Sequence, residues 1–310
     1  MRVVFLATGA FAIPSLEALA EAGHDVAALV TQPDRESGRG RVLTPPRVKP
    51  VAERLGIPVL QLERVRAPEA QAALRELRPE LQVVVAFGQI LPRTVIDVAP
   101  RGTVNVHASL LPRWRGAAPI QWAVASGDAE TGVTTMQIDE GLDTGPLLLA
   151  RPLAIGPDET AGELEPRLAR LGGDLLVETI AGLERGTLAP AAQDPSRATH
   201  ARILTKEDGR VDWTLPARVV ACRARGFHPW PGAFTSHEGR LVKLLRVVEA
   251  PRAVVAQPGE VAVVDALGIS VACGGGSLLR LEEVQPESRR AMPAAAWAQG
   301  ARLVPGARLG

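Results

Sequence analysis

The sequence is poor in several residue types, and the low number of cysteines narrows what the chain can be. Its 310 residues include no Tyr, one Asn, three Lys against 32 Arg, and two Cys. Cys222 and Cys273 are isolated, so neither a disulfide framework nor a cysteine-type zinc site is expected. No apolar run reaches the length of about 18 residues that indicates a membrane span. We therefore expect a cytoplasmic protein with no metal and no membrane partner.

Charge is distributed unevenly along the chain, although the formal net charge is only +1. Residues 1–200 hold 20 basic and 24 acidic residues, a net charge of −4. Residues 201–310 hold 15 basic and 10 acidic residues, a net charge of +5. A basic C-terminal third favours an anionic partner such as RNA. The alternative is an unevenly charged surface without a ligand.

Apolar runs of β character alternate with helical patterns in the first two thirds of the chain. Residues 13–22 and 159–183 have helical spacing of apolar residues. The alternation predicts an α/β fold with a largely parallel sheet covered on both faces. Residues 131–138 and 146–155 predict a hairpin or meander beside that sheet. The runs that predict the other strands are 3–7, 26–31, 82–87 and 103–109.

The texture of the sequence changes after residue 188. Residues 188–204 contain five Ala and two Pro without periodicity, which predicts an interdomain linker. A helix is predicted over 215–226, and the short β-type runs that follow suggest a small barrel or sandwich. We thus predict a catalytic domain at 1–189, a linker at 190–205 and a basic domain at 206–310.

Three glycine-containing segments suggest ligand-binding loops, and two of them resemble nucleotide-binding motifs only superficially. The turn at residues 7–12 contains one glycine, Gly9, whereas the dinucleotide fingerprint needs three. The triplet at 274–276 lacks the Lys-Ser/Thr of a phosphate-binding loop, and a hairpin turn is expected there. The GRGR segment at 38–41 is either a solvated loop or a basic loop over an anionic ligand.

The pattern that carries chemistry lies at residues 105–122. Asn105 and His107 are two residues apart in a predicted strand, so their side chains point to the same face. Asp143 follows the next apolar run within a turn-forming segment. An amide and a protonated imidazole can stabilise an oxyanion while a carboxylate assists proton movement. This set suits direct attack of an amine on a carbonyl; the alternative is a satisfied Asn–His pair and an unrelated turn Asp.

These residues belong to a longer pattern that resembles a known family. NVHASLLPRWRGAAPIQ at 105–121, followed by GLDTG at 141–145, is similar to the signature of the folate-dependent formyltransferases. The resemblance covers most of residues 1–235 and weakens over 245–310 until LVPGARL. The first strand–helix turn departs from the family's usual G-T-P-D/E-F, so no ligand role is assigned to it. Further similar segments are TQPDRESGRGR, VVVAFGQILP, GDAETGVTTMQID, ILTKEDGRVDW and FHPWPGAF.

The resemblance implies a Rossmann-like formyltransferase domain followed by an OB-like barrel. It implies formyl transfer from 10-formyltetrahydrofolate to the α-amine of methionine on initiator tRNA, by a chain that we expect to be a monomer. The implied catalytic residues are Asn105, His107 and Asp143. The implied folate contacts are Ser109, Leu110, Leu111, Pro112, Phe87, Gly88 and Gln89, and the implied tRNA contacts are Arg39, Arg41 and Lys206.

Two other functions stay open at this point. The same chemistry would serve a different acceptor, an amino sugar or a purine-precursor amine, although a small acceptor needs no basic second domain. A different class is an RNA-binding protein with a vestigial catalytic domain. The complete Asn–His–Asp set weighs against that class.

Overall fold

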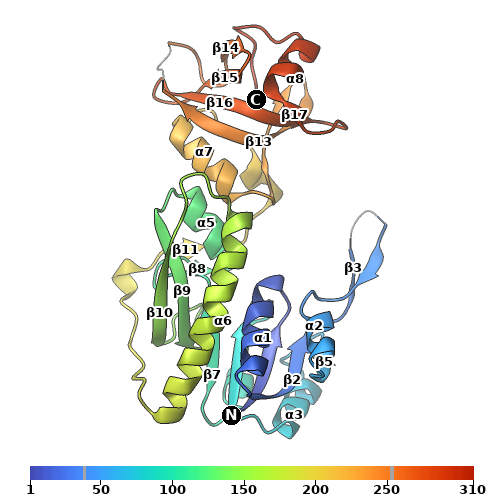
Figure 1. The fold of residues 1–310 in the computed structure, drawn as a ribbon, viewed down its shortest axis with the longest axis vertical. Coiled ribbons are helices and arrows are strands. Elements are labelled where there is room, and N and C mark those ends of the chain that lie inside the picture. Colours follow the sequence, from blue (N-terminus) through green and yellow to red (C-terminus); the bar gives the residue numbers. More distant parts are fainter. Residues whose placement is uncertain (38–39, 252–254) are drawn as a thin grey trace. The chain divides into compact units, whose positions relative to one another are not determined.

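The computed structural model describes residues 1–37, 40–251 and 255–310, which fall into two compact units (Figure 1). The first unit comprises residues 1–119, 130–154 and 165–201. The second comprises residues 120–129, 155–164 and 202–310. Most of the segment predicted as a linker, up to residue 201, thus belongs to the first unit, and the domain boundaries at 189 and 205 stay predictions.

A seven-stranded sheet forms the centre of the first unit, in the order β10-β9-β7-β6-β1-β2-β5. Five strands run parallel, and β9 and β10 are antiparallel to their neighbours. This arrangement confirms the predicted, largely parallel α/β sheet and the predicted hairpin. The strands are β1 (Arg2–Ala7), β2 (Asp25–Thr31), β5 (Val59–Gln61), β6 (Leu81–Val85), β7 (Thr103–His107), β9 (Glu130–Gln137) and β10 (Leu147–Ala154).

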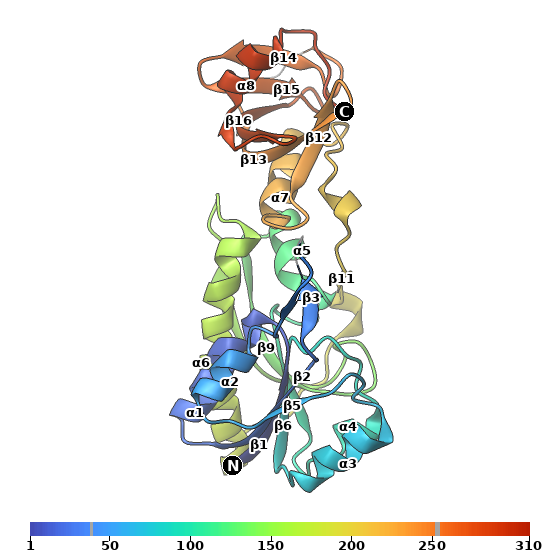
Figure 2. The same cartoon turned by 90° about the vertical axis from the view of Figure 1, so that its right-hand side faces the viewer.

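Helices lie on both faces of this sheet. Figure 2 shows α1, α2 and α6 on one face and α3 and α4 on the other. Glycines let α6 approach its neighbours, because a Cβ on Gly173 would lie 2.8 Å from the carbonyl oxygen of Pro14 in α1. These helices are α1 (Ile13–Glu21), α2 (Lys49–Arg54), α3 (Pro68–Glu76), α4 (Arg93–Ile96) and α6 (Ala161–Arg185).

Two small strand pairs accompany the main sheet. The hairpin of β3 (Arg35–Ser37) and β4 (Val42–Thr44) is anchored at its base, where Lys49 Nζ donates to Asp34 and to Gln61. A parallel pair joins β8 (Arg115–Gly116) to β11 (His200–Ala201). The second pair ties the end of the predicted linker to the loop that follows β7.

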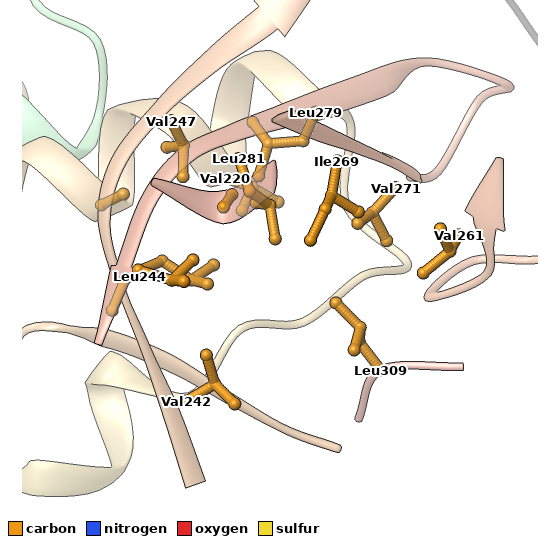
Figure 3. Packing of buried hydrophobic residues seen from close by; sticks show 14 of the residues in the cluster. Val220, Val242, Leu244, Val247, Val261, Ile269, Val271, Leu279, Leu281 and Leu309 are labelled. Carbon is orange, nitrogen blue, oxygen red and sulfur yellow. The ribbon is translucent and has the colours of Figure 1, made fainter. Parts of the chain in front are cut away.

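An antiparallel six-stranded sheet forms the second unit, in the order β12-β13-β16-β15-β14 with β17 paired to β16. Alternate residues face a single core that α7 and α8 cover, and Figure 3 shows part of it around Leu244, Ile269 and Leu281. The elements are α5 (Pro119–Ala125), α7 (Ala217–Gly226), β12 (Ala233–His237), β13 (Arg240–Ala250), β14 (Val261–Asp265), β15 (Gly268–Ala272), β16 (Leu278–Pro286), β17 (Met292–Pro293) and α8 (Ala294–Ala301).

The sheet of the second unit is open. The structure therefore confirms an antiparallel β domain, and the OB-like barrel stays a prediction. Within the described residues, no strand pairing joins β12 directly to β14. The C-terminal segment lies between them: Leu309 N donates to the Gly259 oxygen beside β14, and Gly310 N donates to the Ser236 oxygen of β12. The predicted helix at 215–226 and the hairpin turn at 274–276 are confirmed.

Within the described residues, no helix combines the length and the apolar character needed to cross a membrane.

The thiol of Cys273 is 2% exposed, and burial raises its pKa from 9.0 to about 12. Between these two values the folded chain keeps a proton that the unfolded chain releases, so this group's contribution to stability is lost as the pH rises above about 9. In a Cys222→Ala variant we expect iodoacetamide to leave the folded protein unmodified at about pH 9 and to alkylate it once denatured. Thermal stability should fall more steeply with pH than in Cys222→Ala/Cys273→Ala, and rapid alkylation of the folded protein would contradict the assignment.

Candidate active site

Asn105 and His107 lie at the carboxyl end of β7, between β6 and β9 in the sheet. His107 is 6% exposed, and its Nε2 lies 2.9 Å from the carbonyl oxygen of Trp114. Its Nδ1 lies 3.7 Å from Asp143 Oδ2. The structure therefore brings His107 and Asp143 together, although they are far apart in the sequence.

The Trp114 carbonyl decides which nitrogen of His107 carries the proton in the neutral ring. A carbonyl oxygen only accepts hydrogen bonds, so Nε2 must be the donor to Trp114. In the neutral imidazole Nδ1 then carries a lone pair, and in the charged ring it carries the second proton. Proton exchange is thereby directed to Nδ1, the nitrogen nearest to Asp143.

Asp143 reaches the site by a route that strand order alone does not suggest. Because β9 is antiparallel to β7, its end at Gln137 lies level with Val104, near the start of β7. The loop after β9 then carries the chain to His107. Asp143 has a left-handed backbone, with φ of 53°. Its Oδ2 accepts a 2.8 Å hydrogen bond from the backbone N–H of Gly116.

Asn105 differs from its neighbours because its polar group is not engaged. The residue is half-buried, and its side chain makes no hydrogen bond to any residue that the structure describes. Its backbone pairs with Val84 of β6 and Met136 of β9, which fixes the position of the strand. An amide held on a rigid strand with free donors is suited to an external acceptor atom.

The loop after β7 is organised by Ser109. This residue is fully buried, and its Oγ donates a 2.6 Å hydrogen bond to the Arg113 oxygen. Thr134 Oγ1 donates to the Ser109 oxygen and accepts from Leu111 N. Leu110 packs beside Gly132 of β9, and Pro112 O accepts from Thr199 N. The Ser109 hydroxyl thus builds the loop, and the folate contacts of residues 109–112 stay predictions.

The loop after β6 is held from three neighbouring segments. The buried Phe87 accepts hydrogen bonds on its backbone oxygen from Thr8 Oγ1 and Gln32 Nε2. Gln89 Oε1 accepts from Val65 N, and its Nε2 donates to the Leu62 oxygen. Gly88 has φ of 77°, which places it among conformations that favour glycine. The residue that follows Gln89, Ile90, is 89% exposed.

The predicted tRNA contacts are in different places. Arg39 lies outside the described residues, and Arg41 is exposed in the first unit, 4.0 Å from Glu36. Lys206 is exposed in the second unit, at the start of a short 3-10 turn. A capping box of Thr205 and Asp208 fixes this turn, and Arg202 with Thr205 holds the pKa of Asp208 well below its usual range.

Sequence reasoning missed the residues that join the loops of the site. Gln193 bonds to the loop of Asp143, and Arg115 bonds to Gln193. Thr199 holds the next peptide: its Oγ1 accepts from Trp114 N, and its oxygen accepts from Arg115 N. Gln193 and Thr199 come from the segment expected to be a linker. Its lack of periodicity gave no signal of these contacts.

Comparison with known proteins identifies the family of this chain. Residues 1–180 match the family described as Formyl transferase, and residues 203–302 match Formyl transferase, C-terminal domain. The methionyl-tRNA formyltransferase of Anaeromyxobacter dehalogenans is 55% identical over 306 residues, covering 97% of either chain. That of Geobacter metallireducens is 50% identical over 310 residues, covering 100% of this chain and 99% of the relative.

Solved structures share the fold at low sequence identity. HypX from Aquifex aeolicus in complex with tetrahydrofolic acid has a TM-score of 0.63 at 18% identity, covering 96% of this chain and 47% of that one. WlaRD, a sugar 3N-formyl transferase, has a TM-score of 0.69 at 14% identity, covering 94% and 99%. The matches to both domain families, and identity of about half over the full length of the relatives, show that the chain belongs to the formyl transferase family.

Proposed function

We propose that this chain transfers the formyl group of 10-formyltetrahydrofolate to the α-amine of methionine on initiator tRNA, a step that supports translation initiation. The observation that carries the proposal is the arrangement of three groups in a chain of this family. Asn105 has an unengaged amide, His107 has an oriented imidazole, and Asp143 lies 3.7 Å from that ring. The relatives' shared name and full-length similarity support the tRNA acceptor.

Each of the three residues has a role that follows from its atoms. The folate substrate supplies a formyl carbon that the acceptor amine can attack. The Asn105 amide donates to the formyl oxygen as negative charge develops there. In place of the oxyanion contact expected from the sequence, we assign proton transfer to His107, because its Nε2 is bonded to the Trp114 oxygen. His107 Nδ1 takes the proton that the amine loses, and Asp143 stabilises the resulting imidazolium. As the new C–N bond forms and the bond to folate breaks, His107 returns a proton to the leaving nitrogen.

The residues around the ends of β6 and β7 fit a flat, partly apolar substrate such as folate. Two large apolar side chains, Ile90 and Leu142, are exposed on the loops that follow β6 and β9. Such exposure is unfavourable in water and suits a ligand-binding surface. We propose that residues 109–112 and 87–89 hold the folate, with Ser109 and Gln89 shaping the loops through their own hydrogen bonds.

The second unit fits an RNA-binding role. Within it the positive charge lies in the C-terminal part of the chain, since residues 201–310 carry a net charge of +5. We propose that the sheet of this unit is an OB-like barrel that the C-terminal segment completes, since Leu309 and Gly310 bond to opposite ends of the strand order. Arg39, Arg41 and Lys206 would contact tRNA phosphates, and the reaction would take place in the cytoplasm on a monomeric enzyme.

Supplying labelled 10-formyltetrahydrofolate with methionyl initiator tRNA should yield formylmethionyl-tRNA. An amino sugar and a purine-precursor amine, offered at the same concentration, should accept no label above background. The expected preference follows from the basic residues 201–310, which a small acceptor would not use. Label on a small amine but not on the tRNA would show that the acceptor is the small amine. Absence of transfer to the tRNA and to both small amines would overturn the enzymatic role.

Replacing Asn105 by Ala should lower kcat by about 10²–10³, the loss typical of removing one oxyanion donor. Because the Asn105 side chain bonds to no described residue, the melting temperature should change little. Single-turnover formylation measures the rate of the chemical step, and thermal unfolding provides the control. A rate near that of the wild type would remove Asn105 from the mechanism.

Replacing Lys206 by Gln should raise KM for tRNA and leave kcat nearly unchanged. Losing one phosphate contact should also make the slope of log affinity against log salt shallower by about 1. The matched control is Lys243→Gln, which removes the same charge from an exposed position of the same unit. Equal effects of the two substitutions would mean that general charge, and not a contact at Lys206, determines tRNA affinity.

A further inference from the structure

Gln193 stands out within the segment that leads to the second unit. Of residues 189–197, all of which the structure describes, Gln193 is the only one that is not exposed. Ala191 forms an isolated antiparallel bridge with Leu147 of β10, and Ser196 donates two hydrogen bonds to Asp194. An amide that turns inward from an otherwise solvated segment has a specific reason to do so, and its partners identify that reason.

The Gln193 side chain bonds to two separate loops of the active site. Its Nε2 donates to the backbone oxygens of Asp143 and Gly145, each at 2.8 Å. Its Oε1 accepts from Arg115 Nε at 3.0 Å and from Arg115 Nη2 at 2.7 Å. Carbonyl oxygens only accept and a guanidinium only donates, so the orientation of the amide is determined by its partners.

These bonds hold Asp143 at a point where its conformation needs support. A non-glycine residue with φ of 53° is in a sparsely populated region and persists only where surrounding contacts fix it. Gly116 N binds the carboxylate, and Gln193 binds the carbonyl of the same residue. The second bond of Gln193, to the Gly145 oxygen, holds the peptide units that follow Asp143 in the chain. Without Gln193, the Asp143 carboxylate would keep its hydrogen bond from Gly116 N, but the Asp143 carbonyl would lose its hydrogen bond from Gln193.

Arg115 strengthens this arrangement electrostatically. Its side chain is 7% exposed, and the described residues offer it no carboxylate partner. The charge therefore acts on the Gln193 amide, and a polarised amide donates more strongly from its nitrogen. Arg115 also belongs to β8, and the other residue of this strand, Gly116, donates from its backbone N–H to Asp143 Oδ2. The two anchors of Asp143 thus come from one short strand, one directly and one through Gln193.

We propose that Gln193 is a positioning residue that holds the Asp143 carboxylate beside His107 Nδ1, 3.7 Å away, where it can stabilise the imidazolium. The proposal rests on the proposed function for its activity readout. Gln193 does not contact the reacting atoms and acts through the backbone of Asp143 and Gly145. A segment of the first unit that the sequence suggested to be a linker thereby supports the catalytic site.

Gln193→Glu separates this role from a merely structural one. A carboxylate keeps the bond to Arg115 but places oxygen against the carbonyls of Asp143 and Gly145. We expect kcat to fall about 10-fold or more, while KM for folate and for tRNA changes less than about twofold, because misplacing a catalytic group slows the chemical step. If Gln193 only satisfies Arg115, Gln193→Glu will keep the wild-type kcat, which would overturn the proposal.

A double-mutant cycle tests whether the effect passes through Asp143. Gln193→Ala should lower kcat about 10-fold in the wild type and less than about twofold in an Asp143→Ala background. The matched control is Gln71→Ala on helix α3, which removes an amide whose exposed hydrogen bond goes to the Arg66 oxygen and which should have no effect in either background. Equal losses from Gln193→Ala in both backgrounds would show that Gln193 acts independently of Asp143.

A spectroscopic readout keeps the proposal testable if the acceptor proves to be different. The chain has five His, so ¹⁵N-imidazole labelling gives few signals, and His107→Gln identifies that of His107. Gln193→Glu should shift the His107 Nδ1 signal because the nearby carboxylate moves, whereas Gln71→Ala should not. An unchanged Nδ1 signal in a folded Gln193→Glu protein would overturn the positioning role whatever the acceptor.

Discussion

The active site depends on the hydrogen bond between His107 Nε2 and the carbonyl oxygen of Trp114. This bond fixes the orientation of the ring and gives Nδ1 to the reaction. The carbonyl can perform this role only if its own peptide is immobile. Trp114 has a left-handed backbone, and the N–H groups on either side of its carbonyl are held by Thr199, through Oγ1 and through the backbone oxygen. Thr199, a residue outside the family-like motif, thus holds the carbonyl that sets the tautomer of His107.

The need to hold each catalytic group rigidly also explains why three distant segments come together: β7, the loop after β9, and residues 193–201. The strand β7 supplies side chains on a rigid support, but a strand alone cannot place a carboxylate beside its own imidazole. The loop after β9 supplies Asp143, and the segment at 193–201 fixes that loop to β8. Gly116 shows how close this packing is: it has φ of 120°, and a Cβ there would lie 2.6 Å from the Ala201 oxygen. A side chain at this position would push β8 from β11 and weaken the N–H bond to Asp143.

Much of the fold was predictable because it follows from local patterns. Continuous apolar runs predicted the buried strands, and helical patterns predicted α1 and α6. Asn105 and His107 could be paired from a spacing of two residues in a strand. The direction of β9 was not predictable from its composition, and neither was the return of the Asp143 loop. Gln193 and Thr199 act through long-range hydrogen bonds of individual residues, which leave no periodic pattern in the sequence.

The scarcity of Asn in this chain acquires a physical meaning at the site. Asp at position 105 would bring acceptor oxygens to a place where negative charge develops, and a longer Gln would displace the amide from the face of β7. Asn105 is the one polar side chain among the three whose hydrogen-bonding capacity the described residues leave unused. His107 and Asp143 are committed to Trp114 and Gly116, which orient them. The site therefore combines two groups fixed by the protein with one donor free to bind substrate, and this division of roles favours transfer to an incoming amine without a covalent enzyme intermediate.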